Sequence, residues 1–108
     1  MIQTEIISKF TNLKIVGIIH NYYENRLTIN FENNLNITFE DCVLVFDSGV
    51  INHIISFIAF SGTLGMTLEL KSMGVNPDEY NFIILSKDIT DYENKRELKI
   101  VYKNIISI

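Results

Sequence analysis

Two short stretches of this chain alternate strictly between polar and apolar residues, and this alternation is the strongest constraint on its fold. The stretches are 26–32 and 35–40, and in each of them every second side chain is apolar. Because successive side chains of a β-strand point to opposite faces, the pattern predicts two strands that are each buried on one face. Only Asn33 and Asn34 separate them, so they are predicted to form an antiparallel hairpin.

The register of this hairpin follows from the same pattern, because residues directly opposite each other share a face. A two-residue loop would set apolar side chains opposite polar ones, whereas a three-residue loop, Glu32-Asn33-Asn34, makes one whole face apolar. Such a loop needs a left-handed residue at its third position, which Asn34 can supply. The apolar pairs of this register are Phe31–Leu35, Ile29–Ile37 and Leu27–Phe39.

The preceding segment, 13–22, is predicted to add a third strand to this meander. A three-residue loop, 23–25, would place Asn25 in the left-handed region. The pairs of this register are Ile19–Ile29, Gly17–Phe31 and Tyr22–Arg26, the last an exposed cation–π pair, with His20 on the polar face beside Thr28.

The segments on either side of the meander are less uniform. Helical spacing of apolar residues predicts a short helix over 2–10, which Thr11-Asn12 ends. The continuous apolar run 42–46 predicts a strand that is central or buried on both faces, followed by a turn at 47–49. In 50–60 the periodicity favours a helix and the isoleucine content favours a strand, with the helix slightly preferred.

The second half of the chain alternates again. The segment 63–71 is interpreted as a strand, and its alternative is a helix that Gly74 ends. A turn is predicted at 75–79, and strands are predicted over 80–86 and 97–103, with an exposed loop at 88–95. Alternating lysines in 97–103 are typical of a protected sheet edge. The apolar tail 105–108 needs burial, either in the chain's own core or against a second copy in a homodimer.

These elements predict a single domain over residues 1–108. Its fold class is α+β, with a mainly antiparallel β-sheet (a meander, half-barrel or small sandwich) and one or two short helices. An all-β sandwich is the alternative if 50–60 is a strand. The chain has 108 residues, of which 47% are hydrophobic, enough to bury one core without disulfides.

The compartment is predicted from what the sequence lacks. Cys42 is the only cysteine, so no intramolecular disulfide can form, and a thiol in an apolar run is typical of a buried small hydrophobe. The first residues do not resemble a signal peptide, and the longest apolar-rich stretch is far shorter than the ~20 residues of a membrane helix. We expect a cytoplasmic protein without membrane contact.

The charge of the chain is −4, and its distribution is uneven. No lysine or arginine occurs between Arg26 and Lys71. An acidic chain lacks the basic face that phosphate binding needs, so nucleic-acid binding is not expected. The acidic segment is interpreted either as a solvated face or as a docking face for a basic protein. The predicted partner-binding residues are Glu32, Glu40, Asp41 and Asp47.

No motif in the sequence predicts catalysis, a cofactor or a metal. The two histidines, His20 and His53, lack zinc-ligand spacing and are interpreted as solvated. The glycines of 61–65 fit neither a phosphate loop nor a dinucleotide fingerprint.

The leading functional hypothesis is therefore a non-enzymatic protein-interaction module, such as a small acidic inhibitor or an immunity- or antitoxin-like protein that binds a basic partner. The alternative is a binder of a small apolar ligand in a cup lined by isoleucine and phenylalanine.

Overall fold

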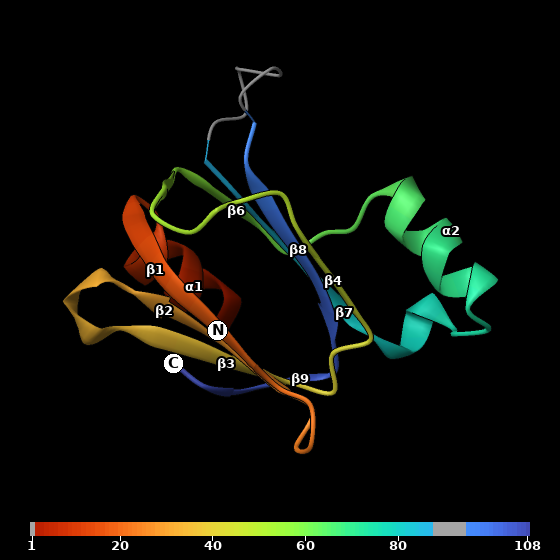
Figure 1. Cartoon of the computed structure of the whole chain (residues 1–108). Coiled ribbons are helices and arrows are strands. Elements are labelled where there is room, and N and C mark those ends of the chain that lie inside the picture. The colour runs from red at the N-terminus through yellow and green to blue at the C-terminus, as the bar shows by residue number, and fades with distance from the viewer. Residues whose placement is uncertain (1, 88–94) are drawn as a thin grey trace.

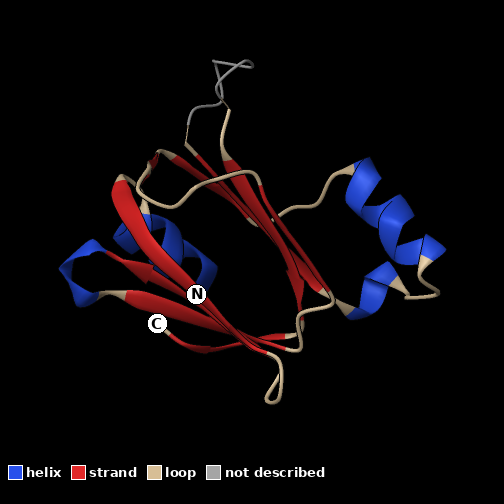
Figure 2. Cartoon of the chain, viewed as in Figure 1, coloured by secondary structure: helices blue, strands red, loops and turns tan. Residues whose placement is uncertain are grey.

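The computed structural model of the chain describes residues 2–87 and 95–108, which form two antiparallel sheets and two α-helices (Figure 1). The first sheet has the order β5-β1-β2-β3-β9, with β1 Leu13–Asn21, β2 Arg26–Phe31, β3 Asn36–Glu40, β5 Ile54–Ile55 and β9 Asn104–Ser107. The second has the order β4-β8-β7-β6, with β4 Leu44–Asp47, β6 Phe57–Ala59, β7 Asn81–Ser86 and β8 Glu97–Tyr102. The helices are α1 Ile2–Phe10 and α2 Leu64–Ser72, and two short 3₁₀ turns are η1 Glu32–Asn34 and η2 Pro77–Glu79. The predicted α+β class with a dominant antiparallel sheet is confirmed (Figure 2).

Bent segments join the two sheets. The segment that contains β3 and β4 runs antiparallel to the segment that contains β8 and β9. At the bend, the backbone N–H of Lys103 donates to the carbonyl of Glu40 (3.1 Å), and that of Val43 donates to the carbonyl of Val101 (2.9 Å). Only Ser56 separates β5, which pairs with β1, from β6, which pairs with β7. The first sheet is thus curled into a half-barrel that shares its core with the second.

The main core lies between the sheets and includes the predicted N-terminal helix. Ile6 and Phe10, one helical turn apart on α1, are fully buried, and the Phe10 ring lies 4.7 Å from the Phe31 ring. Burying a side chain of this size contributes about 1.5–3 kcal/mol. The largest fully buried side chains are Phe10, Phe31, Phe39, Ile6, Ile15, Leu27, Ile29, Ile37, Ile55, Leu70, Ile83 and Leu85.

The predicted register of the β2–β3 hairpin is confirmed. Leu27 pairs with Phe39 and Ile29 with Ile37, and the Phe31 N–H donates to the Leu35 carbonyl (2.8 Å). The loop is the expected three residues, and Asn34 is left-handed at φ 59°, as is Asn33 at φ 64°.

The predicted register of β1 against β2 is wrong by one residue. Ile29 pairs with Ile18 rather than Ile19, and a bulge between Ile15 and Gly17 brings Phe31 opposite Ile15. Side chains on β1 therefore change face at the bulge. His20 consequently lies opposite Leu27 instead of beside Thr28.

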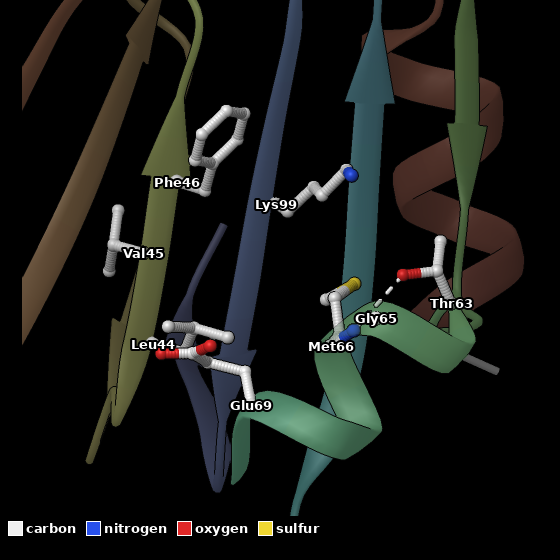
Figure 3. A pocket seen from close by; sticks show the side chains of 8 residues that line it. All are labelled: Leu44, Val45, Phe46, Thr63, Gly65, Met66, Glu69 and Lys99. Atoms are coloured by element: carbon white, nitrogen blue, oxygen red, sulfur yellow. Dashed lines mark hydrogen bonds between the residues drawn. The ribbon is translucent and has the colours of Figure 1, made fainter. Parts of the chain in front are cut away.

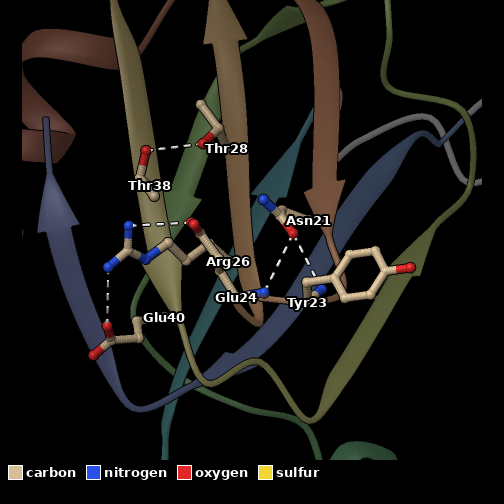
Figure 4. Close-up of polar contacts among 7 residues, drawn as sticks. All are labelled: Asn21, Tyr23, Glu24, Arg26, Thr28, Thr38 and Glu40. Atoms are coloured by element: carbon tan, nitrogen blue, oxygen red, sulfur yellow. Dashed lines mark hydrogen bonds and ion pairs between the residues drawn. The ribbon is translucent and has the colours of Figure 1, made fainter.

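The shift originates in the turn, which has four residues instead of three. The Asn21 side-chain oxygen accepts from the backbone N–H groups of Tyr23 (3.1 Å) and Glu24 (3.2 Å), an Asx turn that extends the loop (Figure 4). Asn21, and not Tyr22, therefore pairs with Arg26, whose guanidinium instead approaches two carboxylates. The left-handed residue of the loop is Asn25, as predicted.

The segment 50–60 forms a turn at 51–53 followed by two short strands, so the slight preference for a helix is wrong. The Asp47 carboxylate accepts from the N–H groups of Gly49 (2.8 Å) and Val50 (3.0 Å), which confirms the predicted turn. Asn52 is left-handed at φ 72°, which interrupts any helix. The β-branched residues that follow form β5 and β6.

The segment 63–71 is the helix α2 rather than the preferred strand, and the alternative interpretation is confirmed. The Thr63 side chain caps the start by accepting from the Met66 N–H (3.2 Å). Gly74, at φ 76°, ends the helix, while the Val75 N–H donates back to the Leu70 carbonyl (2.9 Å).

Two predictions of strand position are wrong. The apolar run 42–46 yields β4, which lies at the edge of its sheet with an exposed Phe46. The segment 97–103 yields β8, which lies between β4 and β7 and is not an edge. Hydrophobicity along one strand does not encode how many strands pair with it, because this number depends on long-range pairing.

Most of the predicted loop 88–95 lies outside the described residues.

The apolar tail is partly buried within its own chain, and Ile106 is left 42% exposed. The tail forms β9, which pairs with β3, and Ile105 and Ile108 pack against the main core.

Two leucines on α2 provide a matched stability test. Leu70 is fully buried and Leu68 is 55% exposed. We expect Leu70→Ala to lower the free energy of unfolding by about 2–5 kcal/mol, because it leaves a cavity, and Leu68→Ala to change it by less than about 0.5 kcal/mol. Urea denaturation monitored by circular dichroism measures both. Equal effects would contradict the packing of α2.

Candidate functional site

Helix α2 covers one end of the outer face of the second sheet and forms a small second core there. Met66 and Leu70 point to the sheet and pack with Val101 of β8. Partly buried side chains around them complete this cluster: Val43, Leu44, Val75, Tyr80, Phe82 and Ile84. Figure 1 shows α2 beside the sheet and clear of the half-barrel. The rest of the sheet face next to the start of α2 is left uncovered.

A groove of about 380 Å³ lies between the start of α2 and the strands β4 and β8 (Figure 3). Its apolar side chains come mainly from Leu44, Phe46 and Met66, whereas the Val45 side chain points away from the groove and packs against the main core. The Lys99 ammonium lies 5.5 Å from the centre of the Phe46 ring.

The charges of the groove are distributed unequally. The Lys99 ammonium is 3.3 Å from the Glu97 carboxylate, which also pairs with Lys95 (3.4 Å), so Lys99 is a basic residue of the groove that shares one carboxylate with a second lysine. Glu69 lines the groove from α2, and no ion pair to it exists among residues 2–87 and 95–108. The groove is therefore apolar with an acidic rim on the side of the helix.

The solvent side of α2 is also apolar. Leu64 is 75% exposed and Leu68 is 55% exposed, and the two are one helical turn apart. On β4, Phe46 is 52% exposed. We refer to Leu44, Phe46, Leu64, Leu68 and Glu69 as the α2–β4 surface.

Sequence reasoning missed this surface because it interpreted 63–71 as a strand. A signal was present: two pairs at i,i+4 spacing, Leu64–Leu68 and Met66–Leu70, lie on different sides of a helix. Thr63 before the pattern and Gly74 after it are the usual helix boundaries.

Two of the four predicted partner-binding residues, Glu32 and Glu40, bond to neighbouring strands. Glu32 accepts a hydrogen bond from the Lys14 backbone N–H (2.6 Å) at the closed end of the β2–β3 hairpin. Glu40, at the other end of β3, lies 3.8 Å from the Arg26 guanidinium (Figure 4) and accepts from the Asn104 amide (3.4 Å). The structure does not bring these two carboxylates together.

The other two, Asp41 and Asp47, lie near the two ends of β4. Asp47 is the last residue of β4 and uses one carboxylate oxygen to hold the following turn. Asp41 precedes the strand in a left-handed conformation (φ 56°). No ion pair within the described residues involves either aspartate.

Cys42 is buried near Tyr102, which confirms the interpretation of this thiol as a buried small hydrophobe. Burial, with a smaller contribution from the Asp41 charge, raises the pKa of the Cys42 thiol to about 11. Burial, assisted by Cys42, raises the pKa of Tyr102 to about 12. The thiol is therefore protonated at neutral pH, which disfavours nucleophilic chemistry.

The histidines lie apart from this surface. The His20 ring stacks on Tyr22 with 4.2 Å between ring centres, and His53 is partly exposed. Within residues 2–87 and 95–108, no three histidine, cysteine or acidic side chains gather closely enough to hold a metal ion.

The helices of the described ranges are all too short or too polar to cross a bilayer. No protein-family model matches this sequence, and neither a curated protein nor a solved structure is significantly similar to it.

The raised pKa of Cys42 predicts a pH dependence of stability. The unfolded thiol ionises near its ordinary pKa of 9.0, whereas the folded thiol ionises near 11. Because the unfolded state loses its proton first, the free energy of unfolding falls as pH rises from 9 to 11, by at most about 1.4 kcal/mol per pH unit for this group.

We expect Cys42→Ala to remove this part of the slope between pH 9 and pH 10, while Tyr102 still contributes above its ordinary pKa of 10.0. Urea denaturation at a series of pH values measures the slope. A variant with the slope of the wild type would contradict the buried neutral thiol.

Proposed function

We propose that the protein is a non-enzymatic protein-interaction module that binds its partner through the α2–β4 surface. The observation that carries the proposal is a short helix with leucine on both sides, one side packed on the sheet and the other exposed. Four of the nine residues of α2 are polar (Thr67, Glu69, Lys71 and Ser72), so the exposed Leu64 and Leu68 form a narrow apolar strip on its solvent side. A partner that covers Leu64 and Leu68 would remove both side chains from water, which is worth about 1.5–3 kcal/mol for each.

Charge indicates the kind of partner. Every residue of the α2–β4 surface falls between Arg26 and Lys71, the segment that has no lysine or arginine. Glu69 belongs to the surface, and Asp41 and Asp47 lie beside it on the β4 side. A basic partner would be attracted to this region, and complementary charge raises both association rate and selectivity. This favours a small acidic inhibitor, of the immunity or antitoxin kind, that acts on a basic protein.

Capture from an extract of the source organism tests the proposal. The immobilised wild type is compared with the double variant Leu64→Ser/Leu68→Ser, whose changes lie on exposed positions and leave the second core intact. We expect the wild type to retain a basic protein that the double variant loses, as measured by quantitative mass spectrometry.

A matched control places serine at another exposed apolar position, Ile19→Ser on β1, which lies outside the α2–β4 surface. This variant should capture the same protein as the wild type. Identical captured sets for the wild type and the double variant would refute the proposed surface.

A second candidate function is the binding of a small apolar ligand, which the volume and apolar lining of the groove favour. The isoleucine and phenylalanine side chains first considered for a ligand cup pack against one another in the main core. The groove on the outer face is therefore the place to test.

Native mass spectrometry of the purified protein distinguishes the two functions. Protein binding predicts a bare chain, whereas ligand binding predicts an added mass of a few hundred daltons. In the second case, the exposed substitution Phe46→Ser should remove the added mass, because the Phe46 ring lines the groove.

A further inference from the structure

Strand β4 has a free edge. It pairs with β8 on one side, and within the described chain no strand pairs with its other side. The pairing partners are Leu44–Val101, Val45–Ile100, Phe46–Lys99 and Asp47–Leu98. Beyond the strand, in the same register, the Ser48 N–H donates to the Glu97 carbonyl (3.0 Å).

This register shows which backbone groups face outward. In an antiparallel pair, directly bonded residues alternate with residues whose N–H and C=O point away from the partner strand. Ser48 is bonded to β8, so Phe46 belongs to the bonded set, and Val45 and Asp47 belong to the outward set. The free edge therefore presents the N–H and C=O groups of Val45 and Asp47.

Strand β4 is a short edge strand of four residues with one charged side chain, Asp47, and both properties weaken strand addition. It lacks three further features that prevent strand addition, which are lysine, proline and β-bulges. Residues 44–47 contain no lysine or proline, and the pairing of β4 with β8 is regular.

The surroundings of the edge restrict what can bind there. Asp41 precedes the strand, Asp47 ends it, and Glu69 approaches from α2, with no compensating ion pair among the described residues. Leu44 and Phe46 point into the apolar groove between β4 and α2 (Figure 3). An added strand would meet the Asp41 and Asp47 carboxylates near its ends, with the Arg96 guanidinium at the Ser48 carbonyl beyond Asp47 (3.1 Å), and beside its centre a groove that is apolar apart from Lys99 and Glu69.

We propose that the free edge of β4 takes up an extended segment of a protein partner, apolar in its centre and carrying lysine or arginine at its ends. The segment adds to the second sheet as a strand, with backbone hydrogen bonds to Val45 and Asp47. An apolar side chain of the segment enters the groove, and its basic side chains lie near Asp41, Asp47 and Glu69. This inference rests on the proposed function and specifies the partner's binding segment.

A short peptide is the probe. The capped pentapeptide Lys-Val-Thr-Val-Lys is titrated into the isotope-labelled protein, and backbone amide shifts and hydrogen exchange are recorded by NMR. We expect shifts centred on residues 43–47 and slower exchange at the amides of Val45 and Asp47. The matched peptide with glutamate in place of lysine should not bind. Equal binding of both peptides, or shifts confined to other elements, would overturn the proposal.

A pair of variants separates the backbone donor from the side chain. Val45→Pro removes the outward N–H and is tolerated at a sheet edge, whereas Val45→Ala keeps the N–H. We expect Val45→Pro to weaken peptide binding about threefold to tenfold relative to Val45→Ala, as the loss of one hydrogen bond implies. Equal affinities of two folded variants would contradict strand addition.

The double variant Asp41→Asn/Asp47→Asn tests the charges without depending on the proline variant. Asparagine at position 47 keeps an oxygen that can hold the turn, so the fold should be retained. We expect weaker binding of the lysine peptide and a smaller effect of salt on its affinity. Unchanged affinity and salt dependence would contradict the role of the two aspartates.

The same variants distinguish this inference from the proposed function. If Val45→Pro still captures the partner that Leu64→Ser/Leu68→Ser loses, strand addition is wrong and the α2–β4 surface stands. If the double serine variant loses no captured protein, the proposed function fails, whatever the result with the peptide.

Discussion

The antiparallel pairing of segment 36–47 with segment 97–107 supports the rest of the structure. It begins in the first sheet as β3 against β9 and continues in the second as β4 against β8. At the bend, hydrogen bonds at Glu40 and Val43 keep the backbone paired while the strands change sheet. Because both sheets share these segments, the apolar faces of the β2–β3 hairpin and of β8 are turned toward one core. The outer face of β8 is then left for α2.

Helix α2 determines where the protein can interact. Its two buried residues pack on the sheet near Val101, but a helix of nine residues is too short to cover the whole outer face. The groove between α2 and β4 and the exposed edge of β4 are consequences of this partial cover. The groove connects the edge of β4 with the start of α2, while Leu64 and Leu68 lie on the other side of the helix from Met66 and Leu70.

The candidate site was only partly predictable. The acidic segment is visible in the sequence, and it led to Glu32, Glu40, Asp41 and Asp47 as binding residues. The structure uses Glu32 and Glu40 in contacts within the protein and places Asp41 and Asp47 on either side of β4. The exposed leucines of α2 were missed because the segment 63–71 was interpreted as a strand. Its apolar residues recur at every second position from 64 to 70, and this spacing fits a strand as well as a helix with two apolar sides.

The sequence by itself determined the local hairpin and its register. In 26–40 the period-two pattern and Asn34 favour the same register. The loop of three residues holds the two strands next to each other in the chain, so their pairing needs no distant segment. The tertiary structure decided the rest: the bulge in β1, the turn and two short strands of 50–60, the helix α2, and the positions of β4 at an edge and β8 in the centre. In each of these segments the local pattern is compatible with two structures. Contacts with residues far away in the chain, which one segment cannot encode, select between them.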